Sequence, residues 1–431
     1  MLVLILHVEA ATDAGPLTRA LAEARRALAE RQREAFLAAG ADTAEIVSGP
    51  PDGLSFGERV AAEMRSRGAG GEPGPSGGPG PSAGPGPSGG PGPNAGPGLS
   101  GGPGPSAGPP AGRAPGGVIV LGSGSIPLAT AADLRRFVEV AAGPGGHALA
   151  NSFYSADVVA VSRAADLAGL PPLPADNALP RWLEERAGVV VTDLRSRWRL
   201  GADIDTPLDL LVLGEAGARA GHGRGHRRGA GALFGEGPAR ERLTELGDIL
   251  SNRRAELLVA GRVSAATLAW LQSGVACRVR ALIEERGLKA ASKLAQGAAD
   301  GAGRHPDTAL DEHSDGAISQ RPPRSILGEL LDRDGPEALA ATVAGLGDAA
   351  LIDTRVLMAH RCGPSESSWP PAEDRFASDL LLPATIADPW LRALTASAAS
   401  APAGHPILLG GHTLVNGGLR LLAQRARVGN R

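Results

Sequence analysis

Three aspartates stand close together in the segment RLGADIDTPLDL. Asp203 and Asp205 are two positions apart, so an extended chain places both carboxylates on the same side. Thr206 is a favourable helix cap, Pro207 suits a first helical turn, and Asp209 complements the positive end of that helix. Paired carboxylates are hard oxygen ligands that suit Mg²⁺, which in turn binds substrate phosphates. The same residues also fit a capped helix start with solvated acids, and both interpretations stay open.

Other polar residues follow predicted strands. Ser123 and Ser125 follow the apolar run 117–121, and Asn151 ends a second run. Asp176 or Asn177 would cap the helix expected from about residue 178, and Asn177 could also read a base or a sugar hydroxyl. Ligands of open α/β sheets bind outside the carboxyl ends of the strands. We therefore expect these residues to share a cleft with the aspartates.

A second polar cluster lies in the last third of the chain. It comprises Asp353, Thr354, Arg355, His360, Asp374, Arg375 and Asp379, followed by the apolar strand ILLG and by Gly411 and His412. A strand that ends in Gly-Gly lets backbone N–H groups approach an anion, and His412 could act as a general acid or base. The alternative is structural: an ion pair of Asp353 with Arg355 or Arg375, and a packed histidine.

Strands and helices alternate through the first half of the chain. Strands are expected at 2–8, 44–47, 117–121, 147–151, 156–162 and 189–192, and helices at 17–39, 56–67, 131–142, 178–186 and from 207. Such alternation indicates a mainly parallel sheet with helices on both faces. The fold class is therefore α/β.

Two segments interrupt this pattern. Residues 68–116 consist of Gly, Pro and Ser triplets in a unit that repeats every twelve residues, and they are predicted to be a disordered insert. Ala replaces Gly at three triplet starts, which argues against a collagen helix. Residues 215–237 form a Gly/Arg/His linker, in which His222 and His226 have the spacing of a helical metal site but too many glycines around them.

Residues 238–431 are predicted to form a second domain. Helical stretches are expected at 238–250 and 265–272, a strand at 275–283, and a disordered loop near 292–325. The remainder is consistent with either mixed α/β or α+β structure. We identify no Walker, Rossmann, nucleophile-elbow or zinc-protease motif here.

Composition excludes several classes of function. The net charge is −3 at pH 7 and the pI about 6.3, so no positive field favours nucleic acid. No apolar run approaches the ~20 residues of a membrane span. The two cysteines, Cys277 and Cys362, fit a reducing compartment. We expect a cytoplasmic protein that binds neither nucleic acid nor membrane.

The segment DIDTPLDL resembles the D-x-D-T-P-x-D ending of nucleotidyltransferases of the glycosyltransferase-A type, which include the molybdenum-cofactor and phospholactate guanylyltransferases. The stretch VIVLGSGSIPLATAADLRRFV is similar to that group's central strand, loop and helix, and the element order agrees over residues 1–67 and 117–214. The resemblance implies a three-layer sheet, a nucleoside triphosphate, Mg²⁺, and attack by a small phosphorylated acceptor on the α-phosphorus. It implies Asp205 as a metal ligand, with Asp203 beside it.

The chain departs from that family's pattern at two places. Where the family has a Gly-rich loop with Arg and Lys, this chain has EAATDAGP, and Arg19 is the nearest basic residue that could replace them. Ser123 and Ser125 stand where the family places its first metal-binding aspartate, and a hydroxyl is a weaker Mg²⁺ ligand than a carboxylate.

Three hypotheses follow. The chain is a divergent Mg²⁺-dependent nucleotidyltransferase, or a non-catalytic protein that binds or senses a nucleotide or phosphorylated metabolite, or a domain that serves the C-terminal region structurally. The nucleotide-facing residues would be Ser123, Ser125, Asn177 and Arg19, and the metal ligands Asp203 and Asp205.

Overall fold

The computed structural model describes residues 1–67, 116–217, 237–284 and 323–429, except 52, 53, 55, 155, 168, 172 and 174–177. Most of the repeat insert, the linker and the loop near 292–325 therefore lies outside the described residues. So do Asp176, Asn177, His222 and His226, whose predicted roles stay predictions.

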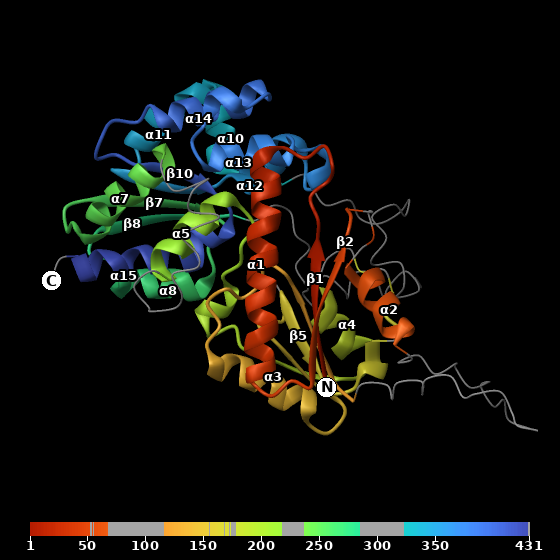
Figure 1. The fold of residues 1–431 in the computed structure, drawn as a ribbon. Helices are drawn as coiled ribbons and strands as arrows, with labels where there is room; N and C mark the ends of the chain where they lie inside the picture. The colour runs from red at the N-terminus through yellow and green to blue at the C-terminus, as the bar shows by residue number, and fades with distance from the viewer. Residues whose placement is uncertain are drawn as a thin grey trace, which may run out of the picture.

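The first half folds around a six-stranded sheet (Figure 1). Its elements are β1 (Leu2–Val8), α1 (Pro16–Ala38), β2 (Thr43–Gly49), α2 (Phe56–Ser66), β3 (Val118–Gly122), α3 (Ala131–Ala142), β4 (His147–Ala150), β5 (Val158–Val161), α4 (Leu179–Glu185), β6 (Val190–Asp193) and α5 (Pro207–Gly217). These bounds agree closely with the strands and helices expected from the sequence. Thr130 caps α3 through a reciprocal capping box with Asp133.

The strand order is β2-β1-β3-β5-β4-β6, and β5 alone runs antiparallel to its neighbours. The α/β class is thus confirmed, but the sheet is mixed, because it contains one reversed strand that periodicity did not reveal. Alternate residues of the central strands enter two separate cores. Leu4 and Val120 face the core beneath α2 and α4, whereas Ile5 and Leu121 face α1 and α3. Helices therefore cover both faces.

The second half contains a four-stranded sheet in which all strands are parallel. Its elements are α7 (Pro238–Ser251), β7 (Glu256–Gly261), α8 (Ala265–Gly274), β8 (Arg278–Ile283), α10 (Ile326–Asp334), α11 (Leu339–Ala344), β9 (Ala349–Asp353), α12 (Thr354–Cys362), α13 (Ala372–Asp379), α14 (Pro389–Ala399), β10 (Ile407–Gly410) and α15 (Leu419–Gly429). Parallel strands alternate with helices, so of the two expected classes the structure has α/β.

In the strand order β10-β9-β7-β8, later strands are added on both sides of β7, which is the first strand of this sheet along the chain. The chain goes from β7 to β8 on one side, then returns to place β9 on the other side. Helices that diverge from such a point leave a crevice at the carboxyl ends of the two strands, which is the usual ligand position in open α/β sheets. In this protein the crevice falls between Gly261 at the end of β7 and Asp353 at the end of β9.

Helix α1 lies between the two sheets (Figure 1). Phe36 and Ala29 pack on the first sheet, whereas Leu21 and Leu28 belong to a core that also contains residues of β7, β9 and β10. Leu208 of α5 joins this same core. The two halves therefore share one continuous apolar interface, and the residues at its edge are held in fixed positions.

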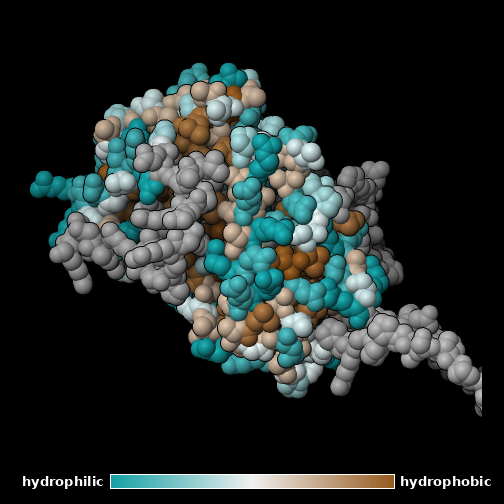
Figure 2. Space-filling model, viewed as in Figure 1, coloured by the Kyte–Doolittle hydropathy of each residue, from teal (hydrophilic) through white to brown (hydrophobic). Residues whose placement is uncertain are grey.

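The visible surface mixes polar and apolar residues (Figure 2). Among the residues that the structure describes, no helix combines the length and apolar character that crossing a bilayer requires.

Candidate functional site

The segment with Asp203 and Asp205 lies against the loop that follows β3. Asp203 forms a backbone bridge with Ser125, and the Ile204 N–H donates to the Gly124 carbonyl at 2.9 Å. A side chain at position 124 would meet the Ile204 carbonyl at 2.8 Å, so this approach depends on glycine. The sequence expectation that Ser125 and the two aspartates lie together is thereby met at the level of the backbone.

The start of α5 fixes the other end of the segment. The Asp209 Oδ2 accepts hydrogen bonds from the N–H groups of Asp205 and Thr206, and the Asp209 N–H donates to the Thr206 hydroxyl. This capping box is the helix start that the sequence predicted. The capped helix start is thus confirmed, but Asp203 and Asp209 are buried and not solvated. The capping box also sets the position of Asp205.

His412 and Thr413 face Asp203 from the second half. Both follow β10 and open the final helical segment, whose residues Leu414–Gly418 form a π-helical turn. The Thr413 hydroxyl donates to Asp203 Oδ1, and His412 Nε2 lies 3.7 Å from Asp203 Oδ2. Single π turns inside α-helices are frequent at functional sites.

Asp203, Asp205 and His412 each offer a ligand atom, and these atoms lie within 4.8 Å of one another. Asp203 is buried, whereas the side chains of Asp205 and His412 are 54% and 28% exposed, so solvent reaches the group. Two carboxylates and an imidazole are a donor set that suits a divalent cation. Just behind them, Asp209 is buried with an Oδ1 that lacks a hydrogen-bond partner among the described residues. This orphaned oxygen is a buried polar atom that a ligand at the site could satisfy.

The two aspartates of the pair differ in pKa. Burial and repulsion from Asp205 raise the pKa of Asp203 to about 6. Desolvation is the largest single influence on Asp205 and opposes its ionisation, but Arg25, His412, Arg355 and a hydrogen bond with Asp203 together outweigh it and hold the pKa of Asp205 below its usual value. Burial, with repulsion from Asp203 and Asp205, raises the pKa of Asp209 well above its usual range. Asp203 and Asp209 therefore keep their protons to a higher pH than ordinary aspartates, and a bound cation could take the place of these protons.

Arg25 is the basic residue that reaches this group from the first half. Its Nε donates to the Ile204 carbonyl at 2.6 Å and its Nη2 pairs with Asp205 Oδ1 at 3.0 Å. Arg19, which the sequence suggested, is exposed and donates to the Ala14 carbonyl instead. The structure brings Arg25 to the aspartates because α1 runs past the segment nine residues after its start at Pro16. No local pattern in the sequence marks Arg25.

Two further ion pairs line the carboxyl edge of the second sheet. Arg262 donates two hydrogen bonds to the Asp353 carboxylate, at 2.6 and 3.1 Å. The buried Arg355 likewise donates two to Asp379, at 2.8 and 2.9 Å. The sequence suggested an ion pair of Asp353 with Arg355 or Arg375, but the side chain of Asp353 pairs with Arg262 instead. Asp353 also caps the helix that contains Arg355, by accepting a hydrogen bond from the Arg355 N–H. Arg262 and Asp353 fill the crevice where the strand order reverses.

Ser123 does not point freely into a cleft. Its hydroxyl lies 3.0 Å from Nδ1 of His7, and both side chains are buried. Asn151 is likewise engaged, with hydrogen bonds to Asp157, Val158 and the Leu200 carbonyl. Both residues hold strand ends together, as structural polar groups do.

An acidic side chain of the second half occupies the N-terminus of α1. The Glu373 carboxylate accepts from the N–H groups of Leu17 and Thr18, at 2.9 and 3.1 Å, and from the Thr18 hydroxyl at 2.9 Å. A helix N-terminus favours anions, and here an internal carboxylate satisfies it. This contact joins the start of α1 to the second half.

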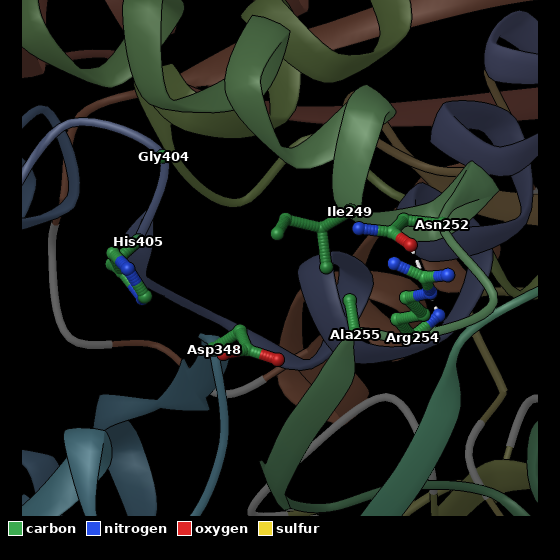
Figure 3. A pocket seen from close by; sticks show the side chains of 7 residues that line it. All are labelled: Ile249, Asn252, Arg254, Ala255, Asp348, Gly404 and His405. Carbon is green, nitrogen blue, oxygen red and sulfur yellow. Dashed lines mark hydrogen bonds between the residues drawn. The ribbon is translucent and has the colours of Figure 1, made fainter.

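A cavity of about 300 Å³ lies at the opposite edge of the second sheet (Figure 3). It is lined by Ile249, Asn252, Arg254, Ala255, Asp348, Gly404 and His405. Ala255 and Asp348 precede β7 and β9, so the cavity lies at the amino ends of these parallel strands. The aspartate–histidine group lies at their carboxyl ends, where the chemistry of such sheets is usual. We therefore place the candidate site at the aspartates and not at the larger cavity. No family model, curated protein or solved structure matches the chain.

Proposed function

We propose that the chain binds a nucleoside triphosphate with a divalent cation at Asp203 and Asp205 and transfers its nucleotidyl group to a small phosphorylated acceptor. The observation that carries this proposal is the convergence of Asp203, Asp205 and His412 at a partly exposed strand-end edge. The resemblance of DIDTPLDL to the nucleotidyltransferase ending, which supplies the nucleotide, is independent of that convergence.

The first-half fold is consistent with this proposal. A six-stranded sheet with helices on both faces carries the motif at the loop after a central strand. We infer that this half is glycosyltransferase-A-like.

In the proposed reaction an acceptor phosphate oxygen forms a bond to the α-phosphorus as the bond to the β-phosphate oxygen breaks and pyrophosphate leaves. Asp203 and Asp205 would hold the cation, which supplies charge neutralisation when bound. Arg25, fixed by its bond to the Ile204 carbonyl, would add positive charge beside them. The backbone bridge between Ser125 and Asp203 keeps the loop after β3 in place during transfer.

A thermal-shift experiment tests the proposal. ATP, GTP, CTP and UTP are each added with Mg²⁺, with Mn²⁺ or with EDTA. A ligand at a hundredfold excess over its Kd stabilises the folded state by about 2.7 kcal/mol. We expect one nucleotide to stabilise the parent chain only with a cation, and Asp205→Asn to lose that shift. The stabilising nucleotide then enters a pyrophosphate-release assay with phosphorylated acids and sugars.

Asp334→Asn is the matched control, because Asp334 also forms an exposed pair with an arginine but lies at the end of α10. It should keep the full shift. A parent chain that gains no stability from any of the four nucleotides, with either cation, would contradict the proposal.

The second candidate is nucleotide or phosphometabolite binding without turnover. The engagement of Ser123 with His7 favours it, because the hydroxyl at the family's first metal position is already committed to the core. Cation-dependent stabilisation without pyrophosphate release with any acceptor would support this candidate over the enzyme.

A further inference from the structure

We propose that His412 completes the cation site as a third protein ligand, so that the bound ion joins the two halves of the chain and is a first-row transition ion of the manganese-to-zinc series in preference to Mg²⁺. This inference rests on the proposed function in one respect, which is that the function requires a cation at Asp203 and Asp205. The nucleotidyltransferase resemblance, which covers the first half, does not supply His412.

The separation of the side chains fits a shared ion. His412 Nε2 and Asp203 Oδ2 are 3.7 Å apart, longer than the ~3.2 Å limit of a good N–H···O hydrogen bond. Two atoms that each lie ~2.1 Å from one ion can be up to ~4.2 Å apart, so the observed gap admits an ion between them. Asp205 is half exposed and pairs with Arg25 through Oδ1, and one of its carboxylate oxygens already lies within 4.8 Å of the ligand atoms of Asp203 and His412.

Neighbouring side chains fix the orientation of Asp203 and His412 by hydrogen bonds. Thr413 donates to the other oxygen of Asp203, and the Asn416 side-chain amide donates to the His412 carbonyl at 2.8 Å. Partners of this kind orient metal-binding side chains. The unpartnered Oδ1 of the buried Asp209 stands behind Asp205, whose N–H the same carboxylate accepts. This buried, unpartnered oxygen beside two other acidic side chains is a second observation that points to a ligand here.

The imidazole decides the class of metal. Mg²⁺ prefers oxygen ligands and retains its waters, whereas imidazole nitrogen favours transition ions. A site with one nitrogen and two carboxylates should therefore bind Mn²⁺ or Zn²⁺ more tightly than Mg²⁺. The ligands of the one ion would come from both halves of the chain, because Asp203 and Asp205 precede α5 and His412 follows β10.

Mn²⁺ titration of the full chain, followed by electron paramagnetic resonance without any nucleotide, tests the inference. We expect one saturable Mn²⁺ site whose pulsed spectrum shows coupling to a directly bound ¹⁴N nucleus. His412→Ala should abolish that coupling and weaken Mn²⁺ binding at least about tenfold, the effect typical of losing even an outer partner of a metal site. The affinity for Mg²⁺, measured by its competition with Mn²⁺, should fall less in His412→Ala than the affinity for Mn²⁺.

His405→Ala is the control, because His405 is an exposed imidazole at the opposite edge of the same sheet. It should keep both the affinity and the ¹⁴N coupling. His412→Gln, checked by circular dichroism, replaces His412→Ala if the alanine variant misfolds, since it also removes the ring nitrogen. Retained coupling in the His412 variants, coupling lost in His405→Ala, or no saturable site in the parent would each overturn the inference.

The two proposals fail separately. Mn²⁺ binding through His412 without any nucleotide shift would leave the metal site standing and remove the nucleotide. A nucleotide shift that His412→Ala preserves, with unchanged Mn²⁺ affinity, would support the proposed function and overturn the third ligand.

Discussion

Ser123 illustrates how a neighbour far along the chain changes the meaning of a residue. Its place after β3 suggested a phosphate-facing hydroxyl, but His7 at the end of the adjacent strand β1 takes up that hydroxyl. Asp205 shows the opposite case, because its side chain stays half exposed beside Arg25 and its pKa lies below the usual value. At the scale of residues, the acids remain available for chemistry and the serine belongs to the core.

Ser123→Ala should destabilise the protein without removing nucleotide binding. The substitution leaves the buried Nδ1 of His7 without its partner, which costs about 1 to 3 kcal/mol. Urea denaturation measures the loss. Ser66→Ala, at the exposed end of α2, should stay within about 0.5 kcal/mol of the parent. A Ser123→Ala protein of parental stability would show that the hydrogen bond contributes little.

His7 should make the protein less stable in mild acid. Burial, together with Arg26, holds the pKa of His7 below its ordinary value of 6.5. The folded state therefore binds a proton less readily than the unfolded state, so stability is complete above pH 6.5 and falls as the pH drops below it. His7→Asn, which keeps a side-chain N–H near Ser123, should flatten this loss between pH 7 and 5. Melting temperatures at half-unit steps test it, and parallel curves for both proteins would refute it.

At the scale of elements, β7 is the strand that organises the second half. It is central, it begins the reversal of strand order, and its last residue allows Asp353 to approach. Gly261 has φ +120°, and a Cβ there would lie 2.4 Å from the Cβ of Asp353. The contact of Arg262 with Asp353 depends on this glycine.

Gly261→Ala should therefore destabilise the protein strongly. Backbone strain at positive φ costs about 1 to 3 kcal/mol, and the overlap with Asp353 adds a similar amount. Gly247→Ala is the matched control, since Gly247 lies inside α7 with open space around it. Alanine there should stabilise the helix by roughly 0.5 to 1 kcal/mol. Changes of equal sign in the two variants, measured by urea denaturation, would contradict this account.

The sequence predicted the first half better than the second. Long alternating runs marked β1, α1 and α3, whereas β7 was missed because a run of four apolar residues between two helices has no distinguishing period. Asp203 and Asp205 could be predicted because their spacing is local. His412 lies more than two hundred residues away, and only the packing of β10 beside the first half brings it to them. Arg25 and Glu373 are likewise far along the chain from the groups that they contact, which are Asp205 for Arg25 and the start of α1 for Glu373.

At the scale of the whole molecule, the two halves share one hydrophobic core. Residues of α1 and α5 share a core with the second sheet, and Glu373 binds the start of α1. The predicted boundary near residue 215 stays a prediction, because α5 precedes it yet packs with both halves. We expect calorimetry of the parent chain to show a single unfolding transition.

Glu373→Gln should weaken that coupling. The neutral amide loses the attraction of the helix N-terminus and two charge-assisted hydrogen bonds, about 1 to 2 kcal/mol together. Calorimetry should show a lower or a split transition. Glu139→Gln, which removes an exposed pair within α3, should leave the parent trace unchanged. An unaltered single transition in Glu373→Gln would show that apolar packing alone joins the halves.

The position of α1 has a consequence for the history of such a chain. At 23 residues the helix spans about 34 Å, and its two apolar sides are each covered by a different half. A gene that lost the second half would not encode a smaller working protein, because Leu21, Leu28 and Leu208 would face water. Replacement of either half by a related sequence would need matching changes on the other side of the helix. The two halves can therefore diverge only together.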